Sequence, residues 1–135
     1  MYILDTKTCL MAMKNESPEL TRRILSVHPD EIAVSAVTLG LMEWELAGRK
    51  TNRQTELSVH LFLSSFAAVS FTEADAEILG SMRSNIEDEM TSIDPFDLMV
   101  IAQCISNKST LITINPEKLS HIPGLVCENW TLPEI

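Results

Sequence analysis

Glycine, cysteine and basic residues are all scarce in this chain, and each scarcity excludes a class of protein. Four glycines in 135 residues supply neither of the glycine-rich loops that bind dinucleotides or nucleoside triphosphates. We therefore expect no nucleotide cofactor. Cys9, Cys104 and Cys127 are odd in number and contain no CxxC pair, which argues against a disulfide framework and against a zinc site. This cysteine usage favours a reducing, cytoplasmic location.

Lysine and arginine total 10 against 19 aspartates and glutamates, which gives a formal net charge of −9 at pH 7. A surface of this sign repels nucleic acid, so RNA binding through a broad basic face is not expected. A nuclease that gathers carboxylates around divalent cations escapes this exclusion, because the cations reverse the local field.

Long hydrophobic runs are also absent. No apolar stretch approaches the about 18 residues of a membrane-spanning helix. The segment Met1–Leu10 contains an acidic residue and lacks the basic start of a signal peptide. We expect neither a membrane segment nor export. With 45% hydrophobic and 21% charged residues, the composition predicts one globular domain over residues 1–135.

Short apolar runs alternate with helical patterns along the chain. Strands are predicted over residues 2–4, 31–35, 68–71 and 110–113, with a short fifth over 124–127. Helices are predicted over 18–27, 37–47, 57–66, 72–86 and 94–107. Because parallel strands need long crossovers, this order predicts an α/β fold whose parallel sheet of four to five strands is flanked by helices on both faces.

Polar residues follow the first predicted strand directly. Asp5, Thr6 and Lys7 come after the apolar run Tyr2–Leu4, and parallel sheets bind their ligands at the carboxyl ends of the strands. A strand-end carboxylate that caps no helix is costly to bury without a partner. Asp5, and with it Asp97, is therefore interpreted as functional.

Three segments resemble, in their order and spacing, the motifs of the VapC-type toxins, which are ribonucleases of the PIN-domain superfamily. They are Tyr2–Thr6, Ile93–Asp97 and Leu111–Asn115. Weaker similarity lies in Val34–Leu39, Arg83, Ile122–Leu125 and Glu128–Trp130, so the resemblance spans almost the whole chain. Each motif alone is common in α/β proteins, and their order carries the signal.

The resemblance implies a PIN-like fold, a hydrolase activity against RNA and Mg²⁺ or Mn²⁺ as the cofactor. Carried over residue by residue, it makes Asp5, Asp97 and Asn115 the metal ligands, with Asp5 and Asp97 as the catalytic carboxylates. Such chemistry needs oxygen ligands, because hard divalent cations prefer them and activate a water only when held with open positions.

Two positions depart from the pattern of that family. Its first motif usually reads Asp-Thr-Asn, but the third residue here is Lys7, whose cation competes with a metal for the carboxylates. The family also has a glutamate three residues after the threonine at position 38, where this chain has Leu41. Glu45 lies one helical turn beyond Leu41 and is either a substitute ligand or an exposed charge.

Three further residues each have two interpretations. Asp94 is either the N-cap of the helix that follows or an additional carboxylate beside Asp97. Lys7 is either a solvated loop residue or an internal cation that would make the site independent of metal. Asn115 is either a ligand or a turn residue, because Asn-Pro favours turns.

The favoured hypothesis is a metal-dependent endoribonuclease toxin of a type II toxin–antitoxin system, neutralised by a cognate antitoxin. The alternative is a catalytically impaired pseudo-nuclease that keeps antitoxin binding and dimerisation, and Lys7 and Leu41 motivate it. A homodimer is expected from the family and from the apolar residues Leu57, Leu61 and Phe62. A phosphoacceptor receiver domain is set aside, because Asp5 has no adjacent acid.

Overall fold

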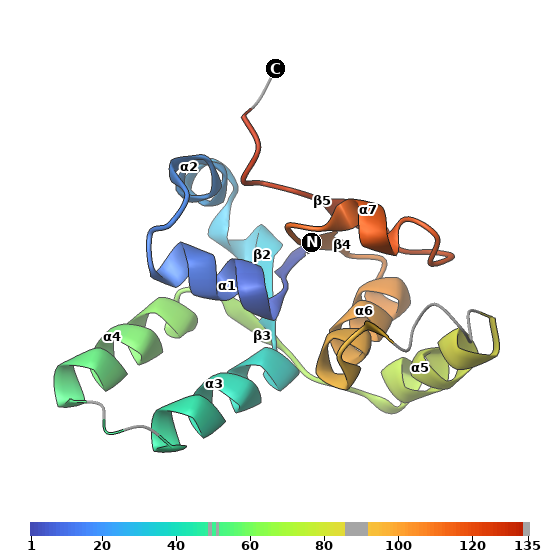
Figure 1. The fold of residues 1–135 in the computed structure, drawn as a ribbon, viewed down its shortest axis with the longest axis horizontal. Helices are drawn as coiled ribbons and strands as arrows, with labels where there is room; N and C mark the ends of the chain where they lie inside the picture. The colour runs from blue at the N-terminus through green and yellow to red at the C-terminus, as the bar shows by residue number, and fades with distance from the viewer. Residues whose placement is uncertain (49, 51, 86–91, 134–135) are drawn as a thin grey trace.

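A parallel sheet of five strands forms the centre of the molecule in the computed structural model, which describes residues 1–48, 50, 52–85 and 92–133 (Figure 1). The strands are β1 (Tyr2–Leu4), β2 (Ile32–Ser35), β3 (Ala67–Val69), β4 (Thr110–Ile112) and β5 (Val126–Glu128). Their order in the sheet is β3-β2-β1-β4-β5, and every neighbouring pair is parallel. The predicted fold class is confirmed.

Seven helices surround this sheet in the described residues. They are α1 (Thr6–Met13), α2 (Pro18–Ser26), α3 (Ala36–Gly48), α4 (Arg53–Ser64), α5 (Glu73–Asn85), α6 (Pro95–Asn107) and α7 (Pro116–Leu119), with a 3₁₀ turn η1 (Pro29–Glu31) before β2. Among the described residues, no helix is both long and apolar enough to cross a membrane.

The two faces of the sheet are buried by different helices, because successive side chains of a strand point to opposite faces. Ile3 and Leu111 pack with α5 and α6, whereas Leu4, Val34 and Ile112 pack with α1, α2, α3 and α4. Figure 1 shows these two groups on opposite sides of the strands. Both faces of the central strands are therefore covered, which explains their unbroken apolar sequence.

Helix α1 is the main element that the sequence patterns did not predict. Its N-cap is Asp5, whose Oδ1 accepts a hydrogen bond of 2.7 Å from the backbone N–H of Thr8. The interpretation of Asp5 as a carboxylate with no helix to cap is therefore wrong. A cap uses one carboxylate oxygen and leaves the other available for a second role.

A buried glutamine ties the sheet to helix α6. Gln103 is fully buried, and its Nε2 donates a hydrogen bond of 3.1 Å to the carbonyl of Val69 on β3. Its Oε1 accepts a hydrogen bond from the hydroxyl of Ser35 at the end of β2. Because both ends of the amide are satisfied, Gln103 fixes α6, and with it the position of Asp97 one and a half turns earlier.

The C-terminal segment is anchored around Trp130, which is 1% exposed. Its ring meets that of Tyr2 edge-on at 5.0 Å, and the guanidinium of Arg23 lies 5.2 Å from its centroid. The indole N–H donates to Glu128, which also pairs with Arg23 at 3.4 Å. These contacts join β1, α2 and the end of β5.

Candidate active site

The point where the sheet changes its winding direction lies between β1 and β4. The chain moves from β1 to β2 and β3 on one side, and then returns to β4 and β5 on the other side of β1. Loops that leave two neighbouring strands in opposite directions open a crevice, and ligands of doubly wound sheets bind there. The polar residues after β1 and β4 are therefore the first place to look for a site.

A cleft with a volume of about 910 Å³ lies at this point. Residues after β1, at the start of α6, and after β4 line it. They include Asp5, Lys7, Ser92, Asp94, Asp97, Thr113, Asn115, Glu117, Lys118 and His121. The structure thus brings Asp5, Asp97 and Asn115, the three predicted ligands, to one cleft together with Asp94 and Lys7.

Hydrogen bonds fix both the backbone and the side chain of Asp5 at the carboxyl end of β1. Its N–H donates to the carbonyl of Ile112 at 3.0 Å, which continues the β1–β4 ladder by one residue, and its own carbonyl accepts from Cys9 at 2.9 Å. With Oδ1 fixed by Thr8, the half-buried side chain has little freedom. Its orientation is therefore set before any ligand arrives.

Asp97 lies in the first turn of α6, and its carboxyl group experiences the other acids of the cleft. Burial raises the pKa of Asp97 above its usual range, and the negative charges of Asp5 and Asp94 raise it further. Asp94 is the N-cap of α6, because its Oδ1 accepts a hydrogen bond of 2.8 Å from Phe96. Asp94 therefore caps the helix, and its charge also contributes to the raised pKa of Asp97.

Asn115 precedes α7 at its N-cap position, but its side chain makes no capping hydrogen bond. Its backbone N–H donates to the hydroxyl of Thr113 at 3.3 Å, and Asn129 donates to the neighbouring carbonyl of Ile114. The loop is therefore stabilised by other groups, and the half-buried amide of Asn115 is left on the wall of the cleft.

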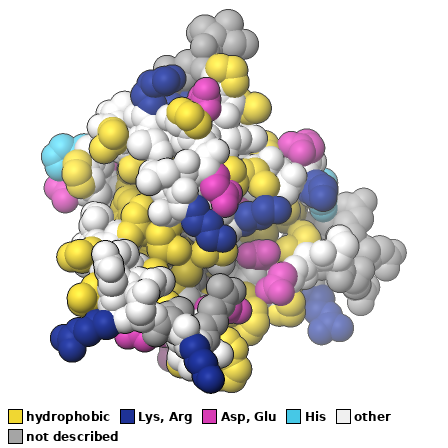
Figure 2. Space-filling view, turned by 60° about the vertical axis from the view of Figure 1, so that its left-hand side comes forward, with side chains coloured by type: hydrophobic (Ala, Val, Ile, Leu, Met, Phe, Trp, Pro, Cys, Tyr) yellow, Lys and Arg dark blue, Asp and Glu magenta, His cyan; other side chains and the backbone are white. Residues whose placement is uncertain are grey.

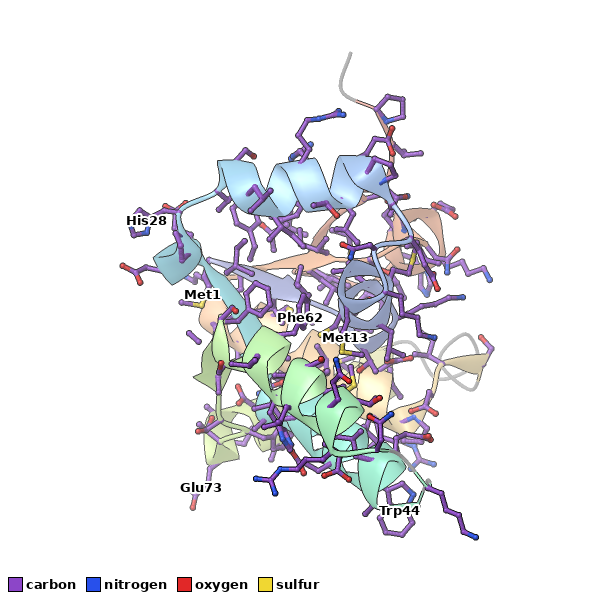
Figure 3. All side chains as sticks on the ribbon, turned by 90° about the vertical axis from the view of Figure 1, so that its left-hand side faces the viewer. Met1, Met13, His28, Trp44, Phe62 and Glu73 are labelled. Atoms are coloured by element: carbon purple, nitrogen blue, oxygen red, sulfur yellow. The ribbon has the colours of Figure 1, made fainter. Side chains whose placement is uncertain are left out.

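Leu41 and Glu45 line a separate groove. This groove, about 990 Å³ in volume, runs between α1, α3 and α4 and includes Thr6, Met13, Leu41, Met42, Trp44, Glu45 and Phe62. Figure 3 shows Met13 close to Phe62, with Trp44 projecting from α3 at its far end. Glu45 does not line the cleft that holds Asp5 and Asp97, so the structure does not bring this predicted substitute to the other acids.

The turn from β1 into α1 contributes neighbouring residues to the cleft and to the groove. Asp5 lines the cleft and the next residue, Thr6, lines the groove. The hydroxyls of Thr6 and the fully buried Thr38 lie 3.0 Å apart in a hydrogen bond that fixes the start of α3 against this turn. Leu41, one helical turn beyond Thr38, therefore stands beside the site but contributes an apolar surface.

Lys118 and His121 also line the cleft, although the sequence patterns gave no role to either. Lys118 belongs to the short helix α7, and His121 follows it. The signal that could have found them is Asn115-Pro116, because a proline at the first helical position predicts a turn of helix that folds back over the strand end.

The three cysteines are unsuited to nucleophilic catalysis. Burial raises the pKa of Cys9 and Cys104 to about 12 and that of Cys127 to about 11, with the charge of Asp5 adding to each shift. Thiolate is the nucleophilic form, and almost none exists at neutral pH with such pKa values.

The donor set of the cleft suits a hard divalent cation. Carboxylate and amide oxygens are the ligands that Mg²⁺ and Mn²⁺ prefer. Burial first, and then the negative charges of Asp5 and Asp94, raise the pKa of Asp97, and a cation would offset those charges. Within the described ranges, no three side chains from His, Cys, Asp and Glu are grouped closely enough to hold one ion. The oxygen donors that line the cleft and would hold such a cation are the carboxylates of Asp5 and Asp97 and the amide of Asn115, with the remaining positions left to water.

The raised pKa of Asp97 predicts how the stability of the protein should change with pH when EDTA keeps metal away from the cleft. A carboxyl whose pKa is raised in the fold binds its proton more tightly when folded, so the folded state gains stability as the pH falls through that pKa. The wild type should therefore gain stability relative to Asp97→Asn between pH 7 and about 3.5, just below the ordinary aspartate pKa. Urea unfolding at each pH measures the difference.

Glu77→Gln, on the exposed face of α5, is the matched control, and its difference from the wild type should change less with pH. A constant difference for Asp97→Asn would contradict the raised pKa of Asp97.

The fold and the cleft together place the chain among the doubly wound α/β domains that carry an acidic site at the switch point. The PIN domain family matches residues 2–125. The chain belongs to this family, and its resemblance to the VapC-type toxins is confirmed.

Three relatives illustrate the similarity. Ribonuclease VapC2 of Rickettsia felis is 26% identical over 131 residues, which cover 96% of this chain and 98% of the relative. The tRNA(fMet)-specific endonuclease VapC of Salmonella typhimurium is 24% identical over 129 residues, covering 96% and 97%. The structure of VapBC2 from Rickettsia felis bound to a promoter DNA fragment contains a chain of 25% identity and TM-score 0.84, with coverage of 96% and 98%.

Proposed function

We propose that this chain is a metal-dependent endoribonuclease toxin of a type II toxin–antitoxin pair. The observation that carries the proposal is the cleft at the β1–β4 switch point, where Asp5, Asp97 and Asn115 lie together in a chain similar to ribonucleases over almost its whole length. The substrate class is RNA, and the cofactor is Mg²⁺ or Mn²⁺.

Each residue of the cleft has a distinct role in this proposal. Asp5, fixed by its capping bond to Thr8, and Asp97, in the first turn of α6, are the two carboxylate ligands. Asn115 adds a neutral oxygen. A divalent cation held there supplies an activated water and offsets the negative charge that develops on the phosphoryl group. Asp94 adds to the negative potential that attracts the cation.

A cognate antitoxin is the proposed protein partner, and the apolar groove beside the cleft suits it. The groove between α1, α3 and α4 ends at Thr6, next to Asp5. Trp44, with 79% of its surface exposed, and Phe62 offer the large apolar contacts on which protein interfaces depend. An antitoxin segment lying in the groove could extend a basic side chain to the carboxylates of the cleft.

A second assembly, a homodimer, is proposed from exposed apolar residues of α4. Leu57 and Leu61 are 51% and 69% exposed, which leaves an apolar face on this helix without cover in the single chain. Light scattering should give the mass of two chains at micromolar concentration. The mass of one chain throughout that range would contradict the homodimer.

The alternative function is a pseudo-nuclease that binds antitoxin and dimerises without cleaving RNA. Two observations favour it: Lys7 places a cation in the cleft, and the position of Leu41 contributes no carboxylate. In this case the cleft would hold no metal, and the apolar groove would remain the functional surface.

Cleavage of RNA by the purified chain distinguishes the two functions. With Mn²⁺, the wild type should cut single-stranded RNA slowly, and EDTA should abolish the activity. Asp97→Asn should remove it as well, because the variant lacks a charged ligand, whereas Glu77→Gln on α5 should retain it. Absence of cleavage at millimolar Mn²⁺, in a preparation that still binds antitoxin, would favour the pseudo-nuclease.

A further inference from the structure

We propose that Lys7 and Lys118 together bind the phosphodiester backbone of single-stranded RNA in the cleft. Both side chains line the cleft that holds Asp5 and Asp97, although they come from opposite ends of the chain. The substrate class rests on the proposed ribonuclease function. The assignment of these two lysines is a separate step, because binding of phosphate by lysine does not require metal or cleavage.

The position of Lys7 at the start of α1 is unfavourable for the stability of that helix. It is the second residue of α1, after the N-cap Asp5 and Thr6, and the first turn of this helix contains no acidic residue. A cation at a helix N-terminus is repelled by the partial positive charge of the helix dipole. The side chain is exposed and forms no ion pair with any carboxylate among the described residues.

Lys118 lines the cleft from the other side of β4. It lies in α7, is exposed, and likewise has no ion pair within the described part of the chain. The loop that carries it is held by the contacts of Asn115 to Thr113 and of Asn129 to Ile114. Two lysines whose ammonium groups form no ion pair among the described residues therefore line the same cleft as the carboxylates.

The charge balance of the cleft shows what the two lysines contribute. Four carboxylates (Asp5, Asp94, Asp97 and Glu117) and two lysines line it, so with His121 neutral its formal charge is −2. One divalent cation brings this charge to zero. Without the two lysines its formal charge would be −4 in the absence of metal, so the lysines lessen the repulsion of RNA whether or not a cation is bound.

In Figure 2, basic side chains lie directly beside acidic ones near the centre of the displayed face. On a chain with a net charge of −9, such local cations supply the attraction for a polyanion that the overall surface does not.

Lys7 would then have two opposite effects. Its charge weakens the binding of a metal beside Asp5, and it strengthens the binding of RNA. Lys118, which follows β4 on α7, should affect RNA more than metal. Substitutions can separate these effects, because RNA binding is measurable in EDTA.

The test is the affinity of the full chain for a fluorescent single-stranded RNA, measured by anisotropy in EDTA over a range of salt concentrations. The variants are Lys7→Gln, Lys118→Gln and their combination. The control is Lys108→Asn, which removes an exposed lysine at the C-cap of α6 and keeps a residue type that accepts its positive φ of 54°. Thermal unfolding checks that each variant folds.

Each cleft lysine should contribute about 0.7 to the slope of log affinity against log salt, or about fivefold in affinity at 0.1 M salt. The double variant should therefore lose about 25-fold, and Lys108→Asn less than about twofold. An unchanged affinity and slope in the double variant, or an equal loss in Lys108→Asn, would overturn the assignment.

The outcome for the proposed function is read separately, from cleavage with Mn²⁺. If the wild type cleaves RNA and the lysine variants bind RNA normally, the lysine assignment fails and the nuclease stands. If binding depends on both lysines and no preparation cleaves RNA, the assignment stands and the nuclease fails. Absence of RNA binding by the wild type in EDTA overturns the lysine assignment.

Discussion

Changing Lys7 to asparagine and Leu41 to glutamate in one chain is expected to raise the affinity for Mn²⁺ at least tenfold. The first change removes a cation from the cleft that holds Asp5 and Asp97. Near an ion, one charge at about 4 Å costs roughly 4 kcal/mol per unit of ion charge at an effective dielectric of 20. Lys7 is exposed, so solvent screens most of this, but about 1.4 kcal/mol suffices for a tenfold change.

The second change supplies a carboxylate beside the cleft. Leu41 is half-buried one turn beyond Thr38, whose hydroxyl is bonded to Thr6 next to Asp5. A glutamate there would extend from α3 near the turn that carries Thr6 and Asp5. Leu41→Gln, which has the length of glutamate without its charge, is the matched control for the change at position 41 and should raise Mn²⁺ affinity less than Leu41→Glu does.

Calorimetry with Mn²⁺ measures the affinities, and RNA cleavage at saturating RNA should rise in parallel. Saturating RNA is needed because Lys7→Asn should also weaken RNA binding. If the unaltered chain binds Mn²⁺ and cleaves RNA as well as the double variant, Lys7 and Leu41 do not impair the site, and Asp94, which lines the cleft, must supply the missing ligand.

Replacing Asp5 should separate its structural role from its proposed catalytic role. Asparagine caps helices about as well as aspartate, so Asp5→Asn should keep the bond to Thr8 and the stability of α1. Asp5→Ala should lose about 1 kcal/mol of stability with the cap. Both variants should lose cleavage by at least about 100-fold, the upper end of what loss of an outer-shell partner costs a metal site.

Urea unfolding and RNA cleavage provide the two readouts. Ser17→Ala, which removes the N-cap of α2 away from the cleft, is the control and should lower stability without the loss of activity. Full activity in Asp5→Asn would show that Asp5 serves only as a helix cap.

The layers of the fold could be predicted from the sequence because strands and helices carry different periods. Tyr2–Leu4 and residues 110–112 were recognised as buried strands from their apolar runs, and Ser17-Pro18 marked the start of α2. The order of the strands could not be read in this way, since it depends on which side of β1 each crossover falls. That order creates the switch point and therefore the cleft.

Helix α1 was missed because Asp5 fits two patterns at once. A strand-end aspartate and a helix N-cap look identical in sequence, and Lys7 is an unfavourable residue for a first helical turn. The apolar spacing of Cys9 and Ala12 was the signal for the helix. Here the residue that terminates the strand also begins the helix, which is why the Asp5 carboxylate is so rigid.

The order of the motifs identified the residues that the structure places in one cleft. It could not show which residues of α3 line that cleft and which line the neighbouring groove. Leu41 and Glu45 are close in sequence to Thr38, yet they face the groove between α1, α3 and α4. Only the orientation of α3, fixed by the bond between Thr38 and Thr6, decides this. Likewise Lys118 reaches the cleft because it lies in α7, and this helix is too short to give a periodic pattern in the sequence.

The position of a bound Mn²⁺ ion tests the central claim most directly. Anomalous diffraction from a crystal of the wild-type chain grown in Mn²⁺ should show one ion bonded to carboxylate oxygens of Asp5 and Asp97, near the amide of Asn115. An ammonium group of Lys7 between the two carboxylates with no ion, or an ion bound elsewhere on the chain, would contradict the assignment of a metal site to this cleft.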